Sequence, residues 1–346
     1  MGVQITELLP KKAIKLEELS GKVLAVDASN HLYQFLTTIR APDGAFFTDS
    51  KGNVTSHIIG LFSRTTHLMK LGIKPAYVFD GEMPALKRLE IKRRTELKEH
   101  AAIKFTAAEA EGDTAGMKKY AAMSTKLTRE MKEDAKKVVE ALGLPVIQAP
   151  GEAEAQAAYM TTKDDAHAVA SQDADSILFR ATRVIRNLSI EGRRKQAGVL
   201  GFNHVEPELI ILNEVLSSLG ISQQQLICLA MLVGTDYNAK GIKGIGPKTA
   251  LKLVKEHKNP ADLFKQVKWE SYFEASWEEV LKLLEKPSVT DDYNLNFTSI
   301  DRENIMQLIC DHHDFSKQRV EKTLEELDRT ASAKKQKGLG EFFGQE

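Results

Sequence analysis

The sequence of 346 residues lacks most of the features that direct a chain to a membrane or to the cell exterior. It has only two cysteines, Cys228 and Cys310, both within helix-like apolar patterns, which supports neither a disulfide framework nor a cysteine zinc site. No apolar run approaches the length of a membrane span. The start, Met1-Gly2-Val3-Gln4, lacks the basic and apolar regions of a signal peptide. We therefore expect an intracellular protein without membrane segments.

An excess of charge of either sign is also missing. The 48 Lys and Arg residues balance the 48 Asp and Glu residues, so the net charge does not indicate a nucleic-acid partner. Hydrophobic residues make up 42% and charged residues 28%, which is typical of a soluble globular protein. The length is enough for one elaborate domain or two ordinary ones. Any preference for nucleic acid must come from how the charges are distributed along the chain.

Carboxylates follow three predicted strands. Residues 22–27 and 74–80 are apolar runs that end in Asp27 and Asp80, and the run 166–170 is followed by Asp173 and Asp175. Helices are predicted between these runs. Strands that alternate with helices predict an α/β fold with a mostly parallel central sheet and helices on both faces, in which ligands collect at the carboxyl ends of the strands. All four acids belong to that edge of the sheet.

Three further acids extend this set. Pro150 and Gly151 mark a helix start, which puts Glu152 and Glu154 in its first turn, and Asp236 follows an apolar helix predicted over residues 223–233. Each acid alone could be a helix cap or part of an Asx turn. Acids at three strand ends favour a metal site instead. Hard oxygen ligands select Mg²⁺ or Mn²⁺ over Zn²⁺, and seven acids can serve two ions.

Residues 83–135 form a charged, alanine-rich insertion with two predicted helices broken near Gly112 and Gly116. Lys87, Arg94 and Lys98 share one helical face, because seven residues nearly complete two turns. This cationic stripe comes directly after Asp80 and points toward a phosphate bound beside the acids. The alternative is a solvated helix face with ordinary Glu–Lys pairs.

A glycine-rich turn at residues 240–250 opens another helix. Gly244 and Gly246 leave backbone N–H groups open, Pro247 fits a first helical turn, and Lys248 adds a positive charge where a helix N-terminus favours an anion. Such a turn holds a phosphate backbone without reading bases. It predicts binding of duplex DNA by position and charge.

Six motifs then carry a resemblance that covers nearly the whole chain. They are Val-Asp-Ala-Ser at 26–29, Val-Phe-Asp-Gly at 78–81, Ala-Pro-Gly-Glu-Ala-Glu-Ala at 149–155, Ser-Gln-Asp-Ala-Asp at 171–175, Gly-Thr-Asp-Tyr at 234–237 and Gly-Ile-Gly-Pro-Lys at 244–248. In this order and spacing the sequence resembles the flap endonucleases of the XPG nuclease superfamily, most closely the archaeal form. The resemblance implies a structure-specific 5′ flap endonuclease with 5′–3′ exonuclease activity, acting by two-metal phosphodiester hydrolysis in Okazaki fragment maturation and DNA repair.

The resemblance also implies roles for individual residues. One Mg²⁺ would be held by Asp27, Asp80, Glu152 and Glu154, and a second by Asp173, Asp175 and Asp236, with Mn²⁺ able to substitute. Lys87 and Arg94 would act on the scissile phosphate. DNA would be contacted by Gly2, Tyr33, Arg40, Arg64, Gly234, Gly244, Gly246 and Lys248, with a base stacked on Tyr33. The insertion would be a helical arch that a single-stranded 5′ flap passes through or beside, and the glycine-rich turn a helix–two-turn–helix motif that holds K⁺.

The predicted organisation is one nuclease domain followed by a tail. The domain covers residues 1–330, made up of an N-terminal region of about 1–100, the arch of about 83–135, an internal region of about 116–258 and a C-terminal helical part of about 259–330. The flexible tail covers 331–346. Within it, residues 336–343 resemble the box by which replication proteins bind the sliding clamp PCNA, with anchors Gln336, Leu339, Phe342 and Phe343. The alternative is a tail folded back on its own protein.

Other functions remain open from the sequence alone. A related 5′–3′ exonuclease or junction-resolving nuclease would share every acid. A non-catalytic DNA-binding client of the sliding clamp would be indicated by loss of acids, and all seven are present. The expected partners are branched DNA with a 5′ flap and PCNA. We expect a monomer in the cytoplasm of an archaeon, or in the nucleus if the source is a eukaryote.

Overall fold

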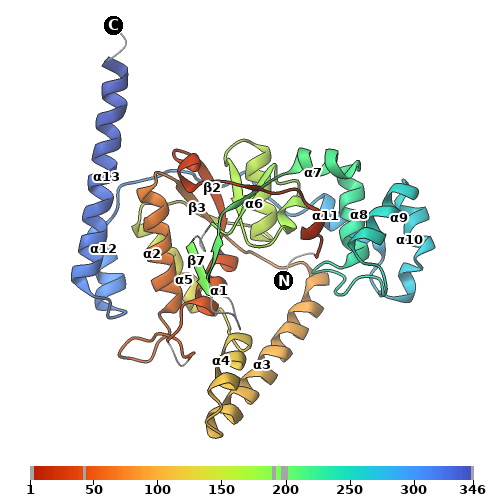
Figure 1. Ribbon diagram of the computed structural model, residues 1–346, viewed down its shortest axis with the longest axis horizontal. Helices are drawn as coiled ribbons and strands as arrows, with labels where there is room; N and C mark the ends of the chain where they lie inside the picture. The colour runs from red at the N-terminus through yellow and green to blue at the C-terminus, as the bar shows by residue number, and fades with distance from the viewer. Residues whose placement is uncertain (1–3, 42–43, 189–191, 196–201, 344–346) are drawn as a thin grey trace.

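A seven-stranded sheet lies at the centre of the protein, as a computed structural model shows it (Figure 1). The structure describes residues 4–41, 44–188, 192–195 and 202–343, with the backbone alone for 89, 118, 192–195, 202–204 and 333–343. In spatial order the strands are β1 (Lys12–Ala13), β9 (Glu208–Ile211), β6 (Arg183–Arg186), β5 (Ala168–Ala170), β2 (Val23–Asp27), β3 (Lys74–Phe79) and β4 (Val146–Gln148). Five neighbouring strands, β6 to β4, are parallel, and only β9 runs antiparallel to both of its neighbours. The predicted mostly parallel α/β sheet is confirmed.

The strands divide their side chains between two cores, because successive residues of a strand point to opposite faces. In β2, Ala25 belongs to one core, whereas Leu24 and Val26 belong to the other. In β5, Val169 faces the first core and its two alanines face the second. A sheet buried on both faces explains why these strands are continuous apolar runs without polar alternation.

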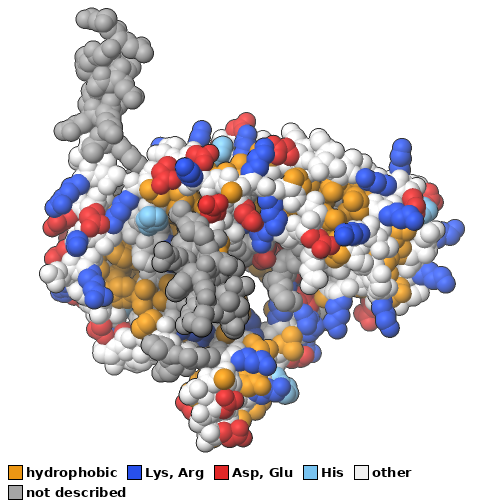
Figure 2. Space-filling view, in the orientation of Figure 1, with side chains coloured by type: hydrophobic (Ala, Val, Ile, Leu, Met, Phe, Trp, Pro, Cys, Tyr) orange, Lys and Arg blue, Asp and Glu red, His pale blue; other side chains and the backbone are white. Residues whose placement is uncertain are grey.

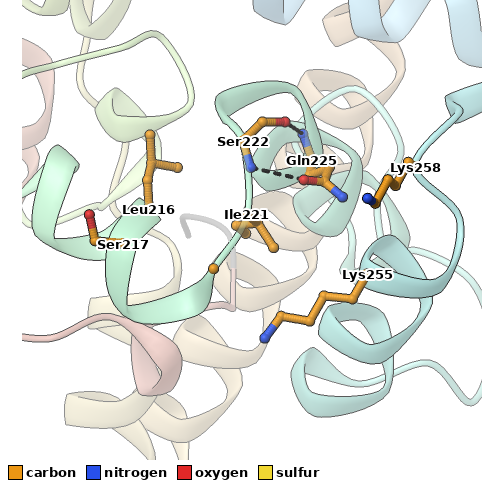
Figure 3. Close-up of a pocket in the computed structure, with 8 residues that line it drawn as sticks. Leu216, Ser217, Ile221, Ser222, Gln225, Lys255 and Lys258 are labelled. Carbon is orange, nitrogen blue, oxygen red and sulfur yellow. Dashed lines mark hydrogen bonds between the residues drawn. The ribbon is translucent and has the colours of Figure 1, made fainter.

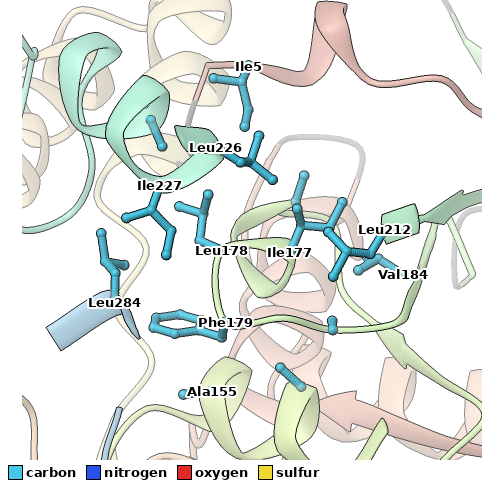
Figure 4. Packing of buried hydrophobic residues seen from close by; sticks show 14 of the residues in the cluster. Ile5, Ala155, Ile177, Leu178, Phe179, Val184, Leu212, Leu226, Ile227 and Leu284 are labelled. Atoms are coloured by element: carbon cyan, nitrogen blue, oxygen red, sulfur yellow. The ribbon is translucent and has the colours of Figure 1, made fainter. Parts of the chain in front are cut away.

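The first core lies under the helices that follow the acid motifs, and Figure 4 shows part of its packing. Its helices are α6 (Ala153–Thr162), α7 (Leu212–Leu219), α8 (Gln223–Val233), α9 (Pro247–Glu256), α10 (Pro260–Gln266) and α11 (Trp277–Glu285). Ile227 of α8 and Leu284 of α11 lie near Phe179, which follows η4 and lies in turn beside Ala155 of α6 (Figure 4). α6, α7 and α8 therefore pack in the same core as the strands whose ends carry the acids.

The second core covers the opposite face of the sheet. Its helices are α1 (Ala28–Thr38), α2 (Ser56–Lys70), α5 (Arg129–Ala141), α12 (Arg302–Ile305) and the start of α13 (Lys317–Phe343). Phe35 of α1 and Leu61 of α2 are buried here beside Tyr77 and Phe79 of β3. Helices thus lie on both faces, as predicted.

The predicted insertion projects from the body as a helical hairpin of α3 (Arg88–Ala110) and α4 (Thr114–Met123) (Figure 1). We call this hairpin the arch. It turns at Gly112, and Asp113 caps α4 by accepting hydrogen bonds from the N–H groups of Ala115 and Gly116. The last residues of the range 83–135 lie instead in α5, where Ala135 is fully buried in the body.

The remaining short elements connect these layers. They are the helical turns η1 (Thr6–Leu8), η2 (Leu16–Leu19), η3 (Ala85–Lys87), η4 (Asp175–Ile177) and η5 (Trp269–Ser271), the π-helical η6 (Met306–Asp311), and the hairpin of β7 (Gly192–Lys195) and β8 (Phe202–Val205). No single helix of the described chain is long and apolar enough to cross a membrane, and α7 with α8 passes that test only as a pair bent by 80°.

The flexible tail predicted at residues 331–346 stays a prediction. The backbone of residues 331–343 continues α13 as a helix (Figure 1). This stretch contains three Lys, two Ala and one each of Gln, Leu and Glu, which favour a helix, beside two Gly, which do not. The side chains of Gln336, Leu339, Phe342 and Phe343 lie outside those that the structure describes.

Candidate active site

The seven predicted acids line one cavity of about 510 Å³ at the carboxyl edge of the sheet. Strand ends supply Asp27 and Asp80, the loop after β5 supplies Asp173 and Asp175, and the start of α6 supplies Glu152 and Glu154. Asp236 joins them from the turn after α8. The opposite wall comes from the arch and its base, with Met83, Lys87, Arg93, Arg94, Leu97, Lys98, Met123 and Leu127. Residues that are 209 positions apart, Asp27 and Asp236, therefore share one site.

Several of the acids are also helix caps. The Asp27 carboxylate accepts from the backbone N–H of Asn30 at 3.0 Å and so caps α1. The Asp80 carboxylate accepts from the N–H of Ala153 at 3.1 Å, at the first turn of α6. Capping, the alternative suggested by the sequence, thus holds for Asp27, which also lines the cavity, whereas Asp80 bonds the first turn of α6 from a separate segment. The caps fix the carboxylates relative to the sheet.

Gly81 brings two of the acid-bearing segments together. A Cβ at this position would lie 2.1 Å from the carbonyl oxygen of Ala149, so only glycine lets the chains approach this closely. The Gly81 N–H donates to the Gly151 carbonyl at 2.7 Å. Asp80 is thereby held next to Glu152.

Polar neighbours orient the carboxylates further. The Ser29 hydroxyl donates to Asp80 at 2.5 Å, and the Asn30 side-chain amide donates to Asp173 at 3.0 Å. The Ser171 hydroxyl donates to Glu154 at 3.2 Å. Tyr237, directly after Asp236, donates its hydroxyl to the Oε1 atom of Glu152. The sequence prediction did not single out Ser29, Asn30, Ser171 or Tyr237, although each lies within or next to an acid motif.

Burial and mutual repulsion raise the pKa values of two of the acids, Asp27 and Glu154. Burial, and then the neighbouring carboxylate of Asp80, raise the pKa of Asp27 to about 7. The pKa of Glu154 is raised well above its ordinary value by burial and by the charges of Asp175, Asp27 and Asp173. Negative charge is therefore concentrated here beyond what the protein's own cations offset. Such perturbed carboxylates in a cavity indicate a functional site.

Two cations of the arch base reach into the carboxylates. The Lys87 ammonium lies 2.6 Å from Glu152 and 2.9 Å from Asp236. Burial lowers the pKa of Lys87, but these two carboxylates reverse the shift, so its pKa is raised and the side chain stays charged. The Arg94 guanidinium pairs with Asp236 and, at 2.8 Å, with Glu90. The structure thus brings the predicted pair to the acids.

Tyr33 of α1 also lines the cavity, and the Lys98 ammonium lies 4.7 Å from its ring centre. This contact joins α3 to α1 across the cavity. Lys87, Arg94 and Lys98, predicted to share a helical face, all line the same wall. Figure 2 shows Lys and Arg side chains along α3 and again around α9 and α10.

The donor set suits a hard divalent cation. All seven predicted ligands are carboxylates, and Mg²⁺ and Mn²⁺ prefer such oxygens while keeping several waters. The raised pKa values of Asp27 and Glu154 show a repulsion that bound cations would relieve. In the described part of the chain, no three His, Cys, Asp or Glu side chains are close enough to enclose an ion directly. Several of these carboxylates are bonded instead to Lys87, Arg94, Asn30 and Tyr237.

The two arginines predicted to contact DNA lie away from the acids. The Arg40 guanidinium donates inside the protein, to the carbonyls of Leu36, Gly44 and Ala121 at 2.9 to 3.0 Å and to the Thr125 hydroxyl at 2.5 Å. It therefore braces the end of α1 against the end of α4. Arg64 is exposed on α2 and lines a separate cavity of about 890 Å³ beside the start of α13.

The predicted glycines separate into two kinds. Gly244 and Gly246 are exposed, and a Cβ at either would meet nothing within 4 Å, so their backbone is open to a ligand. Lys248, on the first turn of α9, is exposed beside them. Gly234 packs closely instead: a Cβ there would lie 2.6 Å from the Gly241 nitrogen. Gly2 lies outside the described residues.

Another cavity, of about 690 Å³, lies between α7, α8 and α9 and shares no residue with the acid cavity (Figure 3). Its polar groups at the start of α8 are already paired, because Ser222 and Gln225 form a capping box with each other. Lys255 and Lys258 are the charged residues that line it. It gathers no set of groups that could carry out chemistry.

Comparisons with known proteins agree on one family. Profiles described as the XPG N-terminal domain and the XPG I-region match residues 1–101 and 143–236. Flap endonuclease 1 of Pyrococcus abyssi is 49% identical over 343 residues, with 99% of this chain and 98% of the relative covered. Flap endonuclease 1 of Thermococcus onnurineus is 49% identical over 344 residues, with 99% of both covered. The solved structure of flap endonuclease-1 from Methanococcus jannaschii is 40% identical, with a TM-score of 0.75, 96% of this chain and 100% of that chain covered.

Proposed function

The chain belongs to the flap endonucleases of the XPG nuclease family, which are structure-specific nucleases, and from that premise we propose that it hydrolyses a phosphodiester at the base of a single-stranded 5′ flap with the help of Mg²⁺. The observation that carries this proposal is the cavity in which seven carboxylates face Lys87 and Arg94 at the base of the arch. A phosphate needs cations, and the carboxylates alone would repel it. The combination suits a phosphodiester bound through divalent ions.

The seven carboxylates would hold two Mg²⁺ ions, or Mn²⁺ in their place, with Asp27, Asp80, Glu152 and Glu154 toward one and Asp173, Asp175 and Asp236 toward the other. When bound, such ions supply Lewis acidity that activates a water and stabilises the leaving oxygen. The hydrogen bonds that Asp27 and Asp80 accept from the backbone N–H groups of Asn30 and Ala153 hold both carboxylates in place.

Lys87 and Arg94 act on the phosphate itself. Both are held as cations beside the acids, and their charges would neutralise the charge that develops on the phosphoryl oxygens in the transition state. No protein nucleophile is needed. Tyr33 would stack a base of the substrate next to this position, because its ring lines the same cavity.

A cleavage assay tests the proposal against its alternatives. The protein is incubated with end-labelled double-flap DNA, plain duplex, nicked duplex and a four-way junction, each with Mg²⁺ and with EDTA. A flap endonuclease cuts the double flap near its base in Mg²⁺ and does nothing in EDTA. Preferred cutting of the nick or the junction would favour the related exonuclease or resolving enzyme. Binding without cutting would favour a non-catalytic clamp client.

The duplex would be held outside the cavity by charge rather than by base contacts. The open backbone at Gly244 and Gly246, with Lys248, offers N–H groups and a cation to one phosphate strand. We propose that carbonyls of the same turn hold a K⁺ ion, which is testable as weaker flap binding when K⁺ is replaced by Li⁺. Arg64, exposed on α2, would contact the duplex as well.

The C-terminal residues would dock to the sliding clamp PCNA. The box at 336–343 has Gln336, Leu339, Phe342 and Phe343 at the anchor spacing. Replacing both phenylalanines by Ala should cost at least about 2 kcal/mol of clamp affinity by calorimetry, because such anchors dominate short-peptide binding. The nuclease rate without clamp should not change. A loss of that rate would mean that the phenylalanines belong to the nuclease body.

A further inference from the structure

Glu90 of α3 differs from the other acids of its helix because it is buried. Its side chain is 6% exposed, whereas Glu96, Glu99 and Glu109 are exposed. A carboxylate is rarely buried to this degree unless it is paired. Glu90 does not line the acid cavity but a neighbouring one of about 330 Å³, between the base of the arch and the turn after α8. It is therefore not among the groups that face a substrate at the acids.

Two arginines of the same helix bind the Glu90 carboxylate. Arg93 donates from Nε and Nη2 to its two oxygens, both at 2.7 Å, and Arg94 donates from Nε to Oε1 at 2.8 Å. A two-point contact of this kind is the strongest that a guanidinium makes with a carboxylate. The hydrogen bonds from Arg93, and then those from Arg94, lower the pKa of Glu90 to about 2 against the effect of burial. Glu90 is thus a fixed negative charge at neutral pH.

Arg94 lies between the two cavities and lines both of them. Its Nε donates to Glu90, and its Nη2 donates to Asp236. A guanidinium carries five N–H donors in one rigid plane, so two anchored donors fix the direction of the remaining ones. Asp236 is a proposed metal ligand, whereas Glu90 is not. Glu90 is therefore the anchor that stays available to Arg94 when cations occupy the acids.

We propose that Glu90 is a positioning residue for cleavage, which holds the Arg94 guanidinium so that its remaining N–H groups reach the scissile phosphate. Without this anchor the long Arg94 side chain is free to turn toward the nearest carboxylates of the acid cavity. A catalytic group misplaced by about 1 Å can slow a reaction by about 10²-fold. This inference rests on the proposed nuclease function.

A double-mutant cycle in single-turnover flap cleavage by the full chain tests the proposal. In Mg²⁺, Glu90→Ala should slow cleavage by about 10²-fold, and Glu90→Gln, which keeps an acceptor oxygen for Arg94, by about tenfold. In an Arg94→Ala background neither change should cost more than about twofold, because Glu90 acts through Arg94. Glu96→Gln is the matched control, since it removes the same charge from an exposed position of α3 and should cut at the wild-type rate.

A second measurement follows Arg94 without catalysis. In the protein without DNA, the Nε–H of Arg94 donates to Glu90, so its side-chain NMR signal should be protected from exchange with water. Arg94→Lys assigns the signal by removing it. Glu90→Gln should lose this protection, and Glu96→Gln should keep it. The fold should survive in all variants by circular dichroism, because Arg93 and Arg94 are 39% and 32% exposed and can be hydrated when Glu90 is replaced.

The outcomes separate a positioning role from a structural one. If Glu90→Ala costs as much in the Arg94→Ala background as in the wild type, Glu90 acts by another route and the inference is overturned. Cleavage by Glu90→Gln at or above the wild-type rate would overturn it as well, because Glu90 would then only offset the charge of Arg94. An Arg94 signal that stays protected in Glu90→Gln would mean that another group holds the guanidinium. If the wild-type protein cuts no flap, the proposed function fails and this inference fails with it, even if Glu90 protects the Arg94 signal.

Discussion

The sheet and the arch bury different kinds of side chain. Around the sheet, large residues such as Phe35, Leu61 and Phe79 are buried on one face, and the other face is packed as fully. In the arch the contact between α3 and α4 buries Ala101, Ala108 and Ala121. Fully burying a Leu or Phe side chain stabilises by about 1.5–3 kcal/mol, whereas a methyl group contributes less than about 1 kcal/mol. The sheet therefore carries most of the stability.

The two regions meet mainly through polar and charged groups. Lys87 and Arg94 join the arch base to Glu152 and Asp236, and Arg40 joins α1 to the end of α4. Such contacts can exchange with a phosphate at little cost, unlike a packed apolar interface. The difference teaches how the parts are held: the sheet fixes the carboxylates through two packed cores, whereas we expect the arch to open locally at a lower free-energy cost than the body.

The largest effect should follow from removing a carboxylate on the rigid side. Asp175→Ala should lower flap cleavage in Mg²⁺ by at least about 10³-fold, or about 4 kcal/mol on the barrier, because the site would lose one of its proposed metal ligands. Flap binding should survive. The melting temperature should not fall, since the charge of Asp175 repels Glu154 in the folded state. Cleavage at the wild-type rate would refute the assignment, and a large drop in melting temperature would make Asp175 structural.

Removing a cation on the arch side should give the next largest effect. Lys87→Ala or Arg94→Ala should slow single-turnover cleavage by about 10²–10³-fold, because each acts on charge that develops in the transition state. Flap affinity should change much less. Lys92→Ala is the matched control, since it removes a cation from an exposed position of α3 outside the cavity lining. Equal losses in rate and affinity would reduce Lys87 and Arg94 to binding residues.

The burial of the sheet on both faces explains why its strands could be predicted from the sequence. Strands of the sheet are apolar runs because both faces are buried, and Asp27, Asp80, Asp173 and Asp175 follow them directly. Because the carboxyl ends of parallel strands meet at one edge of the sheet, these four acids must lie at the same edge. Local pattern and tertiary position agree here, so the cavity that the acids line could be predicted before the structure.

The features that the sequence did not reveal depend on tertiary contacts between separate segments. Nothing local shows that Arg40 also braces the arch, because its acceptors at Ala121 and Thr125 are more than 80 residues away. Glu90 looks like an ordinary acid of a solvated helix until its burial is known. The helical backbone of residues 331–343 was also not predicted, because polarity and a terminal position indicate a flexible segment.

Lowering the pH should decrease the free energy of unfolding of the body around the sheet. His57 on α2 is 1% exposed, and neither ring nitrogen has a hydrogen-bond partner within the described chain. Burial, and then the charge of His313, lower its pKa to about 4 from the ordinary 6.5. The unfolded chain therefore binds a proton that the folded chain refuses, so stability is constant above about pH 6.5 and falls as the pH drops toward 4.

For this one group the loss between pH 7 and pH 5 should be roughly 2 kcal/mol. Urea unfolding at both pH values measures it, with His57→Leu as the comparison that removes the titrating ring. The variant should lose less stability on acidification than the wild type, whatever its absolute stability. An identical loss in both proteins would mean that His57 does not titrate in this range.

The smallest effect should come from loosening the arch without touching either the acids or a core. Arg40→Lys keeps the charge but loses the planar fork that reaches Leu36, Gly44, Ala121 and Thr125 together, and it weakens the stacking on Phe46, whose ring centre lies 4.0 Å from the guanidinium carbon. Local opening of the arch should become easier by about 1 kcal/mol, or five- to tenfold in amide exchange near residues 119–126. Amides of β2 and β3 should keep their protection, because Arg40 contributes nothing to the packing of the sheet. Hydrogen exchange of the protein without DNA resolves the two regions in one experiment. Faster exchange everywhere would make Arg40 a support of the whole fold, and unchanged exchange at the arch would mean that Arg40 does not brace it.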